Sequence, residues 1–343
     1  MTSPTEARAA RGGRLAGFLA SQLRNIAPVI VLVVMVAFFS AASDTFFTTR
    51  NFMNILSQIS LTAIIATGLT FVILTAEIDL SVAAVANAVG IMVAYFTLQP
   101  DYVNIANLPV HGWLAIGLTL TACLAIGLTT AFGVTVIGIP SFIMTLAMMQ
   151  IANGISALLV RGQIAYNYPD AVTFLGSGSI FGVRASIVVA AVFLLTAHLV
   201  LTYTRFGRYV YMVGGNREAA EYSGVNVRFV IGAVLVIGAL CSGVAGMLGV
   251  AYFGSAQQNQ FDTYLLDAIA AVVVGGTSLF GGRGGIGNTI IGLLVLGVLN
   301  NGLDHIQIDS FLKILIRGLI LLAALIVNVY AQTLRAPRTE DEG

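Results

Sequence analysis

Residues 229–253 read FVIGAVLVIGALCSGVAGMLGVAYF, a run of 25 residues without a charged side chain. A helix of this length extends for about 38 Å at 1.5 Å per residue, and the hydrocarbon core of a bilayer is about 30 Å thick. The run is too long for a strand, and its apolar residues do not alternate with polar ones. The segment therefore predicts an α-helix that crosses a membrane.

Nine further apolar runs flank this segment, each bounded by polar residues or by Gly and Pro. Hydrophobic residues make up 58% of the chain and charged residues only 9%, against about 25% charged residues in soluble domains. The composition predicts an all-α polytopic membrane protein, with a transmembrane domain over 25–330 between tails over 1–24 and 331–343. The ten predicted spans are 26–42, 52–75, 80–98, 113–137, 141–160, 186–203, 229–253, 265–280, 286–303 and 311–330.

The distribution of arginine predicts the orientation of these spans, because short cytoplasmic loops are enriched in Lys and Arg. With a cytoplasmic amino terminus and ten alternating spans, only Arg50, Arg161 and Arg184 fall outside the cell. Both termini are therefore expected in the cytoplasm, although an eight-span arrangement would leave them there as well. Eleven arginines fall inside: Arg8, Arg11, Arg14, Arg24, Arg205, Arg208, Arg217, Arg228, Arg283, Arg335 and Arg338.

Several kinds of chemistry are excluded. A net charge of +1 excludes a nucleic-acid binder that works through a large basic surface. The only lysine, Lys313, is not part of a Gly-Lys-Ser/Thr phosphate loop, and the three histidines lack the spacing of a metal site. Neither cofactor, metal nor catalytic residue is predicted. Any energy source must then be an ion gradient or a partner.

The longest polar segment on the predicted cytoplasmic side is 204–228. It contains Glu218-Ala219-Ala220-Glu221, which favours a short helix, and Gly224 can end that helix in the left-handed conformation. Asn216 can cap its start. Such a helix would present charges to a cytosolic partner, and the alternative is a solvated helix without one.

The pattern Glu-Ala-Ala-x-x-x-Gly in this segment resembles the coupling loop of bacterial ABC-importer permeases, which docks into the ATPase subunit. The surrounding Thr204-Arg205-Phe206-Gly207-Arg208 and Gly214-Gly215-Asn216 are similar to the ribose/xylose-type monosaccharide permeases in particular. By this resemblance, the residues of the ATPase-coupling loop are Gly207, Arg208, Asn216, Glu218, Ala219, Ala220 and Gly224.

Three other segments resemble the same family: Glu77-Ile78-Asp79-Leu80-Ser81-Val82, Ile139-Pro140-Ser141-Phe142-Ile143-Met144-Thr145-Leu146, and the Gly-rich stretch 275–284. Ala76-Glu77 stands where the family commonly has Gly-Gly, which leaves the identity of the sugar open. The resemblance implies a homodimer in the bacterial inner membrane, with cytosolic ATPase subunits and a periplasmic sugar-binding protein. The permease itself would catalyse no reaction.

Two polar or Gly-rich interruptions, at 75–81 and 275–284, occupy comparable places in the two halves of the chain. Paired interruptions of this kind often mark the pathway of a transporter. Asp79 is expected to cap the following helix at the cytoplasmic edge, and ion coupling is the alternative role for it. The candidate pathway or gating residues are Glu77, Asp79, Ser81, Gly275, Gly276, Thr277 and Ser278.

Lys313 and Arg317 lie four residues apart in the last predicted span and so share one helix face. Because a charge that faces lipid is costly, Arg317 is expected to pair with an acidic residue in the protein interior. The candidates for this structural ion pair are Asp267, Asp304 and Asp309. The segment 161–185, the longest polar one outside, is expected to contact the binding protein.

The sequence therefore predicts the permease subunit of an ATP-driven monosaccharide importer. A branched-chain amino-acid permease of the same superfamily and an ion-coupled secondary carrier are the alternatives. The ligand of the periplasmic binding protein encoded beside this chain would distinguish the amino-acid permease from a sugar permease. ATPase genes next to the gene for this chain would argue against the secondary carrier.

Overall fold

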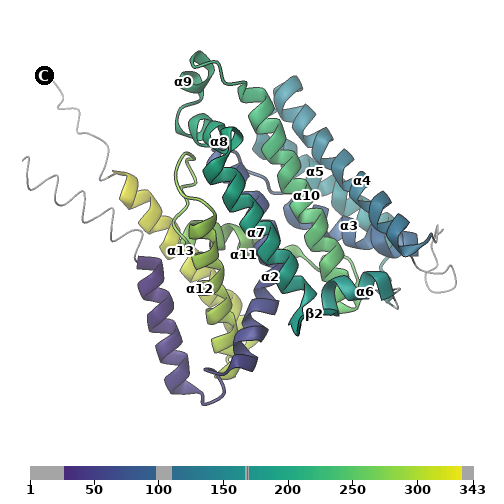
Figure 1. Ribbon diagram of the computed structural model, residues 1–343, viewed down its shortest axis with the longest axis vertical. Coiled ribbons are helices and arrows are strands. Elements are labelled where there is room, and N and C mark those ends of the chain that lie inside the picture. The colour runs from purple at the N-terminus through teal and green to yellow at the C-terminus, as the bar shows by residue number, and fades with distance from the viewer. Residues whose placement is uncertain (1–26, 98–109, 167, 169, 334–343) are drawn as a thin grey trace, which may run out of the picture.

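The computed structural model describes residues 27–97, 110–166, 168 and 170–333 (Figure 1). The predicted tail 1–24 and residues 334–343 of the other tail lie outside this part. The helices are Ala27–Ala42, α2 (Thr49–Leu74), α3 (Val82–Thr97), α4 (Gly112–Phe132) with the π-helical η2 (Gly133–Ile137), α5 (Ser141–Val160), α6 (Asp170–Ser177), α7 (Ala185–Tyr203), α8 (Arg205–Gly215), α9 (Arg217–Tyr222), α10 (Val227–Phe253), α11 (Asp262–Val274), α12 (Ile286–His305) and α13 (Ser310–Thr333). This confirms an all-α fold.

Six of the described helices are long and apolar enough to cross a membrane: α2, α4 with η2, α5, α7, α10 and α12. The helix Ala27–Ala42 and α3 are apolar but shorter. The predicted span 265–280 is wrong at its end, because α11 stops at Val274, before Gly275. Its 13 residues extend for only about 20 Å, less than the thickness of a hydrocarbon core. The fold is thus that of a polytopic membrane protein.

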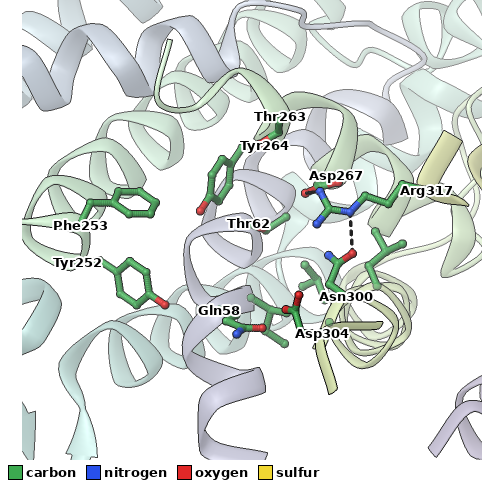
Figure 2. Close-up of a pocket in the computed structure, with 14 residues that line it drawn as sticks. Gln58, Thr62, Tyr252, Phe253, Thr263, Tyr264, Asp267, Asn300, Asp304 and Arg317 are labelled. Atoms are coloured by element: carbon green, nitrogen blue, oxygen red, sulfur yellow. Dashed lines mark hydrogen bonds and ion pairs between the residues drawn. The ribbon is translucent and has the colours of Figure 1, made fainter. Parts of the chain in front are cut away.

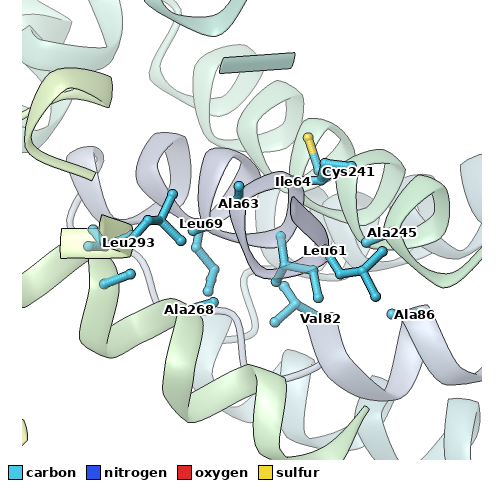
Figure 3. Close-up of a cluster of buried hydrophobic side chains, with 14 of the residues drawn as sticks. Leu61, Ala63, Ile64, Leu69, Val82, Ala86, Cys241, Ala245, Ala268 and Leu293 are labelled. Carbon is cyan, nitrogen blue, oxygen red and sulfur yellow. The ribbon is translucent and has the colours of Figure 1, made fainter. Parts of the chain in front are cut away.

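The centre of the bundle is formed by α2 and α10, which pack against each other, and α10 also packs against α3 and α4. Within the apolar 18-residue stretch of α2, 83% of the residues are buried inside the protein, against 28% in the corresponding stretches of α5 and α7. The core between the central helices is built mostly from small and aliphatic side chains, among them Leu61, Ala86 and Ala245 (Figure 3). The outer helices direct apolar side chains away from the protein, as expected for contact with lipid or with another chain.

The two ends of the bundle carry different short elements. The helices α8 and α9 lie at the end where α10 begins, and α6 and β2 lie at the opposite end (Figure 1). There β1 (Ala165–Tyr166) pairs with β4 (Ser255–Ala256), and β2 (Ser179–Ile180) pairs with β3 (Val183–Arg184), both antiparallel. The predicted polar segment 161–185 is therefore folded over most of its described length.

Candidate functional site: a junction between two short helices and two helix interruptions

The segment 204–228 folds into two helices, α8 and α9, rather than the single short helix predicted. Thr204 begins α8 by accepting a hydrogen bond from the backbone N–H of Gly207 at 3.1 Å. Asn216 begins α9 by accepting one from the N–H of Ala219 at 2.9 Å, which confirms the predicted cap. The signal for α8 was present in the sequence, since Thr204 precedes apolar residues with helical spacing, including Val210 and Val213.

The end of α9 has the conformation predicted from Gly224. Its φ angle is +81°, in the left-handed region, and its N–H donates to the carbonyl of Glu221 at 2.9 Å. Ala220 is buried and anchors the helix, whereas Glu218 and Tyr222 are exposed, Tyr222 to 91%. Exposed aromatic side chains such as this one are enriched in protein–protein contacts.

The two interruptions share one backbone geometry. After α2, Ala76 has a φ of +60° and the N–H of Glu77 donates to the carbonyl of Val72 at 3.2 Å. After α11, Gly276 has a φ of +106° and the N–H of Thr277 donates to the carbonyl of Val272 at 3.1 Å. Both helices therefore end in the same left-handed capping arrangement. The two interruptions therefore resemble each other in backbone geometry where each helix ends, and their role in the pathway stays a prediction.

The interruptions also touch each other and α8. The N–H of Gly282 donates to the carbonyl of Leu74 at 2.9 Å, which joins the second interruption to the end of α2. Gly214 lies against both, since a Cβ atom there would come within 1.7 Å of the Leu74 oxygen and 2.7 Å of the Gly282 nitrogen. Only glycine allows this approach.

Tyr211 adds a side-chain contact between α8 and the second interruption. Its hydroxyl donates to the carbonyl of Gly284 at 2.9 Å. Burial raises the pKa of the Tyr211 phenol above its ordinary value of about 10, so the hydroxyl remains a donor at neutral pH. We refer to α8, α9 and residues 75–81 and 275–285 together as the junction.

An ion pair connects α9 to the first interruption. The guanidinium of Arg217 pairs with the carboxylate of Glu77. The side chain of Glu77 is only 10% exposed, whereas that of Arg217 is 54% exposed. The pair was not predicted, because the two residues are 140 positions apart in the sequence. Arg217 therefore compensates a carboxylate that would otherwise be buried without a counter-charge.

Asp79 has a different role from the predicted helix cap. Its Oδ1 accepts from the N–H of Ser81 at 2.8 Å and from the Ser81 hydroxyl at 2.6 Å, and so holds a turn before α3. Asp79 is 2% exposed and faces Gly238, eleven residues beyond the start of α10. It therefore lies well inside the bundle rather than at the predicted edge, because 75–81 folds back between the helices.

The first interruption is also held by α5, the helix that contains most of the motif Ile139–Leu146. The N–H of Leu80 donates to the Thr145 hydroxyl at 3.2 Å, and the N–H of Ile78 donates to the Ser141 hydroxyl at 3.4 Å. In the second interruption, the N–H of Ser278 donates to the carbonyl of Arg283 at 3.0 Å. The polar groups of both interruptions are thus held within the protein.

The predicted acidic and basic residues of the last helices lie at the opposite end of the bundle. Arg317 Nη1 is 3.4 Å from Asp267 Oδ2, and its Nε donates to Oδ1 of Asn300 at 2.6 Å. Asp304 pairs instead with Lys313. Asp309 accepts from the N–H of Phe311 at 2.8 Å and so begins α13. Among the described residues, no cluster of three or more His, Cys, Asp or Glu could hold a metal ion.

Comparison with known proteins places these features in a context. Residues 51–325 match the model of a family described as branched-chain amino acid transport system / permease component. The ribose import permease protein RbsC of Escherichia coli K12 is 37% identical, over 88% of this chain and 92% of the relative. The D-allose transport system permease protein AlsC of the same organism is 33% identical, over 87% and 89%. Its xylose transport system permease protein XylH is 30% identical, over 94% and 96%. No solved structure matches the chain.

Proposed function

This chain belongs to the family described as branched-chain amino acid transport system / permease component, and we propose that it is the membrane permease of an ATP-driven importer for a monosaccharide in the bacterial inner membrane. The observation that carries this proposal is the identity of 37% with a ribose import permease over 88% of the chain. The relatives named for allose and xylose support a sugar over a branched-chain amino acid, although the family description names the latter.

The exposed face of α9 is the proposed docking surface for a separate cytosolic ATPase. Of the seven predicted coupling residues, Gly207 and Ala220 are buried and support the docking surface through packing. The other five are exposed and available to a partner: Arg208, Asn216, Glu218, Ala219 and Gly224.

The junction supplies a route from this surface to the helix interruptions. A displacement of α9 by the ATPase would act on residues 75–81 through Arg217 and Glu77. A displacement of α8 would act on residues 275–285 through the Tyr211 hydrogen bond. It would also act on both interruptions through Gly214, which lies against Leu74 and Gly282. We expect the predicted gating segments to change conformation together, because the N–H of Gly282 donates to the carbonyl of Leu74, the residue directly before 75–81.

The proposed topology has ten crossings over 25–330, with both termini in the cytoplasm, and the non-helical residues 275–285 complete the crossing that begins with the short helix α11. It places α8 and α9 on the cytoplasmic side and the β2–β3 hairpin on the periplasmic side. Phe181, at the tip of that hairpin, is fully exposed and has a φ of +50°, so it is a candidate contact for the periplasmic binding protein. A second copy of the chain would complete the translocation pathway.

Reconstitution tests the proposal. The chain, its ATPase and its binding protein are incorporated into liposomes, and uptake of D-ribose, D-xylose, D-allose and L-leucine is measured. Uptake of at least one sugar should require ATP hydrolysis and should survive collapse of ion gradients by ionophores. ATP-dependent uptake of leucine alone would favour the amino-acid permease. Uptake that stops with the gradients would favour the secondary carrier.

A further inference from the structure

A cavity of about 300 Å³ lies between α2, α10, α11, α12 and α13, at the end of the bundle away from α8 and α9. Under the proposed topology this is the periplasmic half of the protein. Its volume is at the small end of the range for ligand pockets, which suits a single sugar ring. The cavity is separate from the junction and contains none of the residues assigned to it.

Several hydrogen-bonding groups in this cavity have no partner within the described part of the chain. The amide of Gln58 and the hydroxyls of Tyr252 and Tyr264 line the cavity, and none of them makes a hydrogen bond there. Figure 2 shows the Tyr252 hydroxyl directed toward Gln58 and Asp304. Oδ1 of Asn300 accepts from Nε of Arg317, and the NH₂ group of Asn300 has no acceptor within the described part of the chain. These groups are available to a ligand.

The charges around the cavity compensate one another. Arg317 lies against Asp267 at 3.4 Å, and Asp304 is paired with Lys313. A ligand with a charge of its own would meet no unpaired opposite charge and would have to compete with these ion pairs. A neutral ligand would not, since a carboxylate in an ion pair can still accept hydrogen bonds from hydroxyl groups. This balance disfavours a free amino acid, which carries an ammonium and a carboxylate group.

The remaining lining combines aromatic rings with aliphatic side chains. The rings of Tyr252, Phe253 and Tyr264 line the cavity together with Leu293. A sugar ring presents hydroxyl groups at its edge and C–H groups on its faces, so it needs both planar polar partners and apolar surfaces. The lining of the cavity provides both.

We propose that this cavity binds one monosaccharide during import, through hydrogen bonds to Gln58, Tyr252, Asp304 and Asn300. The proposal rests on the proposed function and adds a sugar site within the permease itself. Each neutral hydrogen bond that is removed should weaken binding about two- to tenfold. Affinity at such a site is expected to be modest, because the sugar must leave it again.

Transport by the reconstituted importer provides the first test. Two variants each remove one polar group from the cavity: Tyr252→Phe removes a hydroxyl, and Gln58→Leu removes an amide. The control is Tyr203→Phe, which removes a hydroxyl at an exposed position of α7 outside the cavity. We expect the two cavity variants to move about two- to tenfold less sugar per ATP hydrolysed, and Tyr203→Phe to match wild type.

Direct protection provides a second test on the full-length permease alone. Cysteine is placed at position 58 by Gln58→Cys, in a background without Cys123 and Cys241, and its alkylation by a membrane-impermeant maleimide is followed. The transported sugar should slow alkylation at least twofold, and L-leucine should not. If the wild type imports a sugar but the cavity variants match it and alkylation is unaffected, the site is overturned and the proposed function stands. If the wild type imports leucine and no sugar, both are overturned.

Discussion

Arg217 in α9 forms an ion pair with Glu77 in the segment that separates α2 from α3, and so joins an exposed helix to the interior of the bundle. α9 carries the proposed ATPase contact, and residues 75–81 include the buried Asp79. The pair is therefore a direct charged connection between the proposed docking surface and a candidate gating segment. Substitutions of these two residues can therefore test how ATP hydrolysis is coupled to transport.

Loss of this ion pair should uncouple transport more than it unfolds the protein. Arg217→Gln leaves the Glu77 carboxylate, which is only 10% exposed, without its counter-charge, so we expect a loss of about 1–3 kcal/mol of stability. We expect ATP hydrolysis to continue while sugar uptake per ATP falls severalfold. Arg228→Gln, an exposed position at the start of α10, is the matched control. The exchange of both charges, Glu77→Arg with Arg217→Glu, should restore part of the uptake. An Arg217→Gln importer with wild-type coupling would contradict the role of the pair.

The end of α9 should depend on the left-handed conformation of Gly224. Gly224→Val places a β-branched residue at a φ of +81°, which costs about 1–2 kcal/mol or more. We expect normal insertion into the membrane and loss of sugar-stimulated ATP hydrolysis. Gly215→Val is the control, because Cβ has open space at both positions and only Gly224 has a positive φ. Hydrolysis at the wild-type level in Gly224→Val would show that α9 is not the ATPase contact.

Phe181 offers a test of the opposite face. Its left-handed φ of +50° is unfavourable for a bulky residue and favourable for glycine, so Phe181→Gly should leave folding intact or slightly improve it. If the exposed ring contacts the binding protein, stimulation of ATP hydrolysis by that protein should require severalfold higher concentrations of it. Basal hydrolysis in its absence serves as the internal control. An unchanged concentration dependence would exclude Phe181 from the contact.

The contact between Arg317 and Asp267 should act as a clamp between α13 and α11. Arg317→Leu leaves Asp267 without its counter-charge in a mostly buried position, and we expect a loss of about 1–3 kcal/mol of stability. Adding Asp267→Asn should recover part of this loss, whereas Asp309→Asn should not, because Asp309 caps α13 instead. Thermal unfolding of the purified variants measures both effects. Strictly additive losses for Arg317→Leu and Asp267→Asn would disprove the clamp.

Local sequence patterns were sufficient wherever the decisive interaction spans only a few residues. The run 229–253 predicted α10 to within two residues at its start, because an uncharged apolar run of this length is typical of a single membrane-spanning helix. Asn216 and Gly224 were correctly predicted as the ends of α9, since a cap depends on one side chain or one backbone angle. The end of α11 was missed by six residues, because Leu279 and Phe280 continue the apolar run beyond the point where Gly275 and Gly276 turn the backbone.

The sequence by itself therefore determined the class of the protein, the positions of most helices and the two interruptions, all of which follow from hydropathy and local backbone preference. Only the tertiary structure decided which distant groups meet. It paired Glu77 with Arg217, placed Asp79 inside the bundle, selected Asp267 over Asp304 and Asp309 for Arg317, and gathered five helices around the polar cavity. Glu77 and Arg217 are 140 positions apart in the sequence, and the cavity brings together residues as distant as Gln58 and Arg317. These contacts depend on how the helices pack in three dimensions, which the periodicity of a single sequence does not specify.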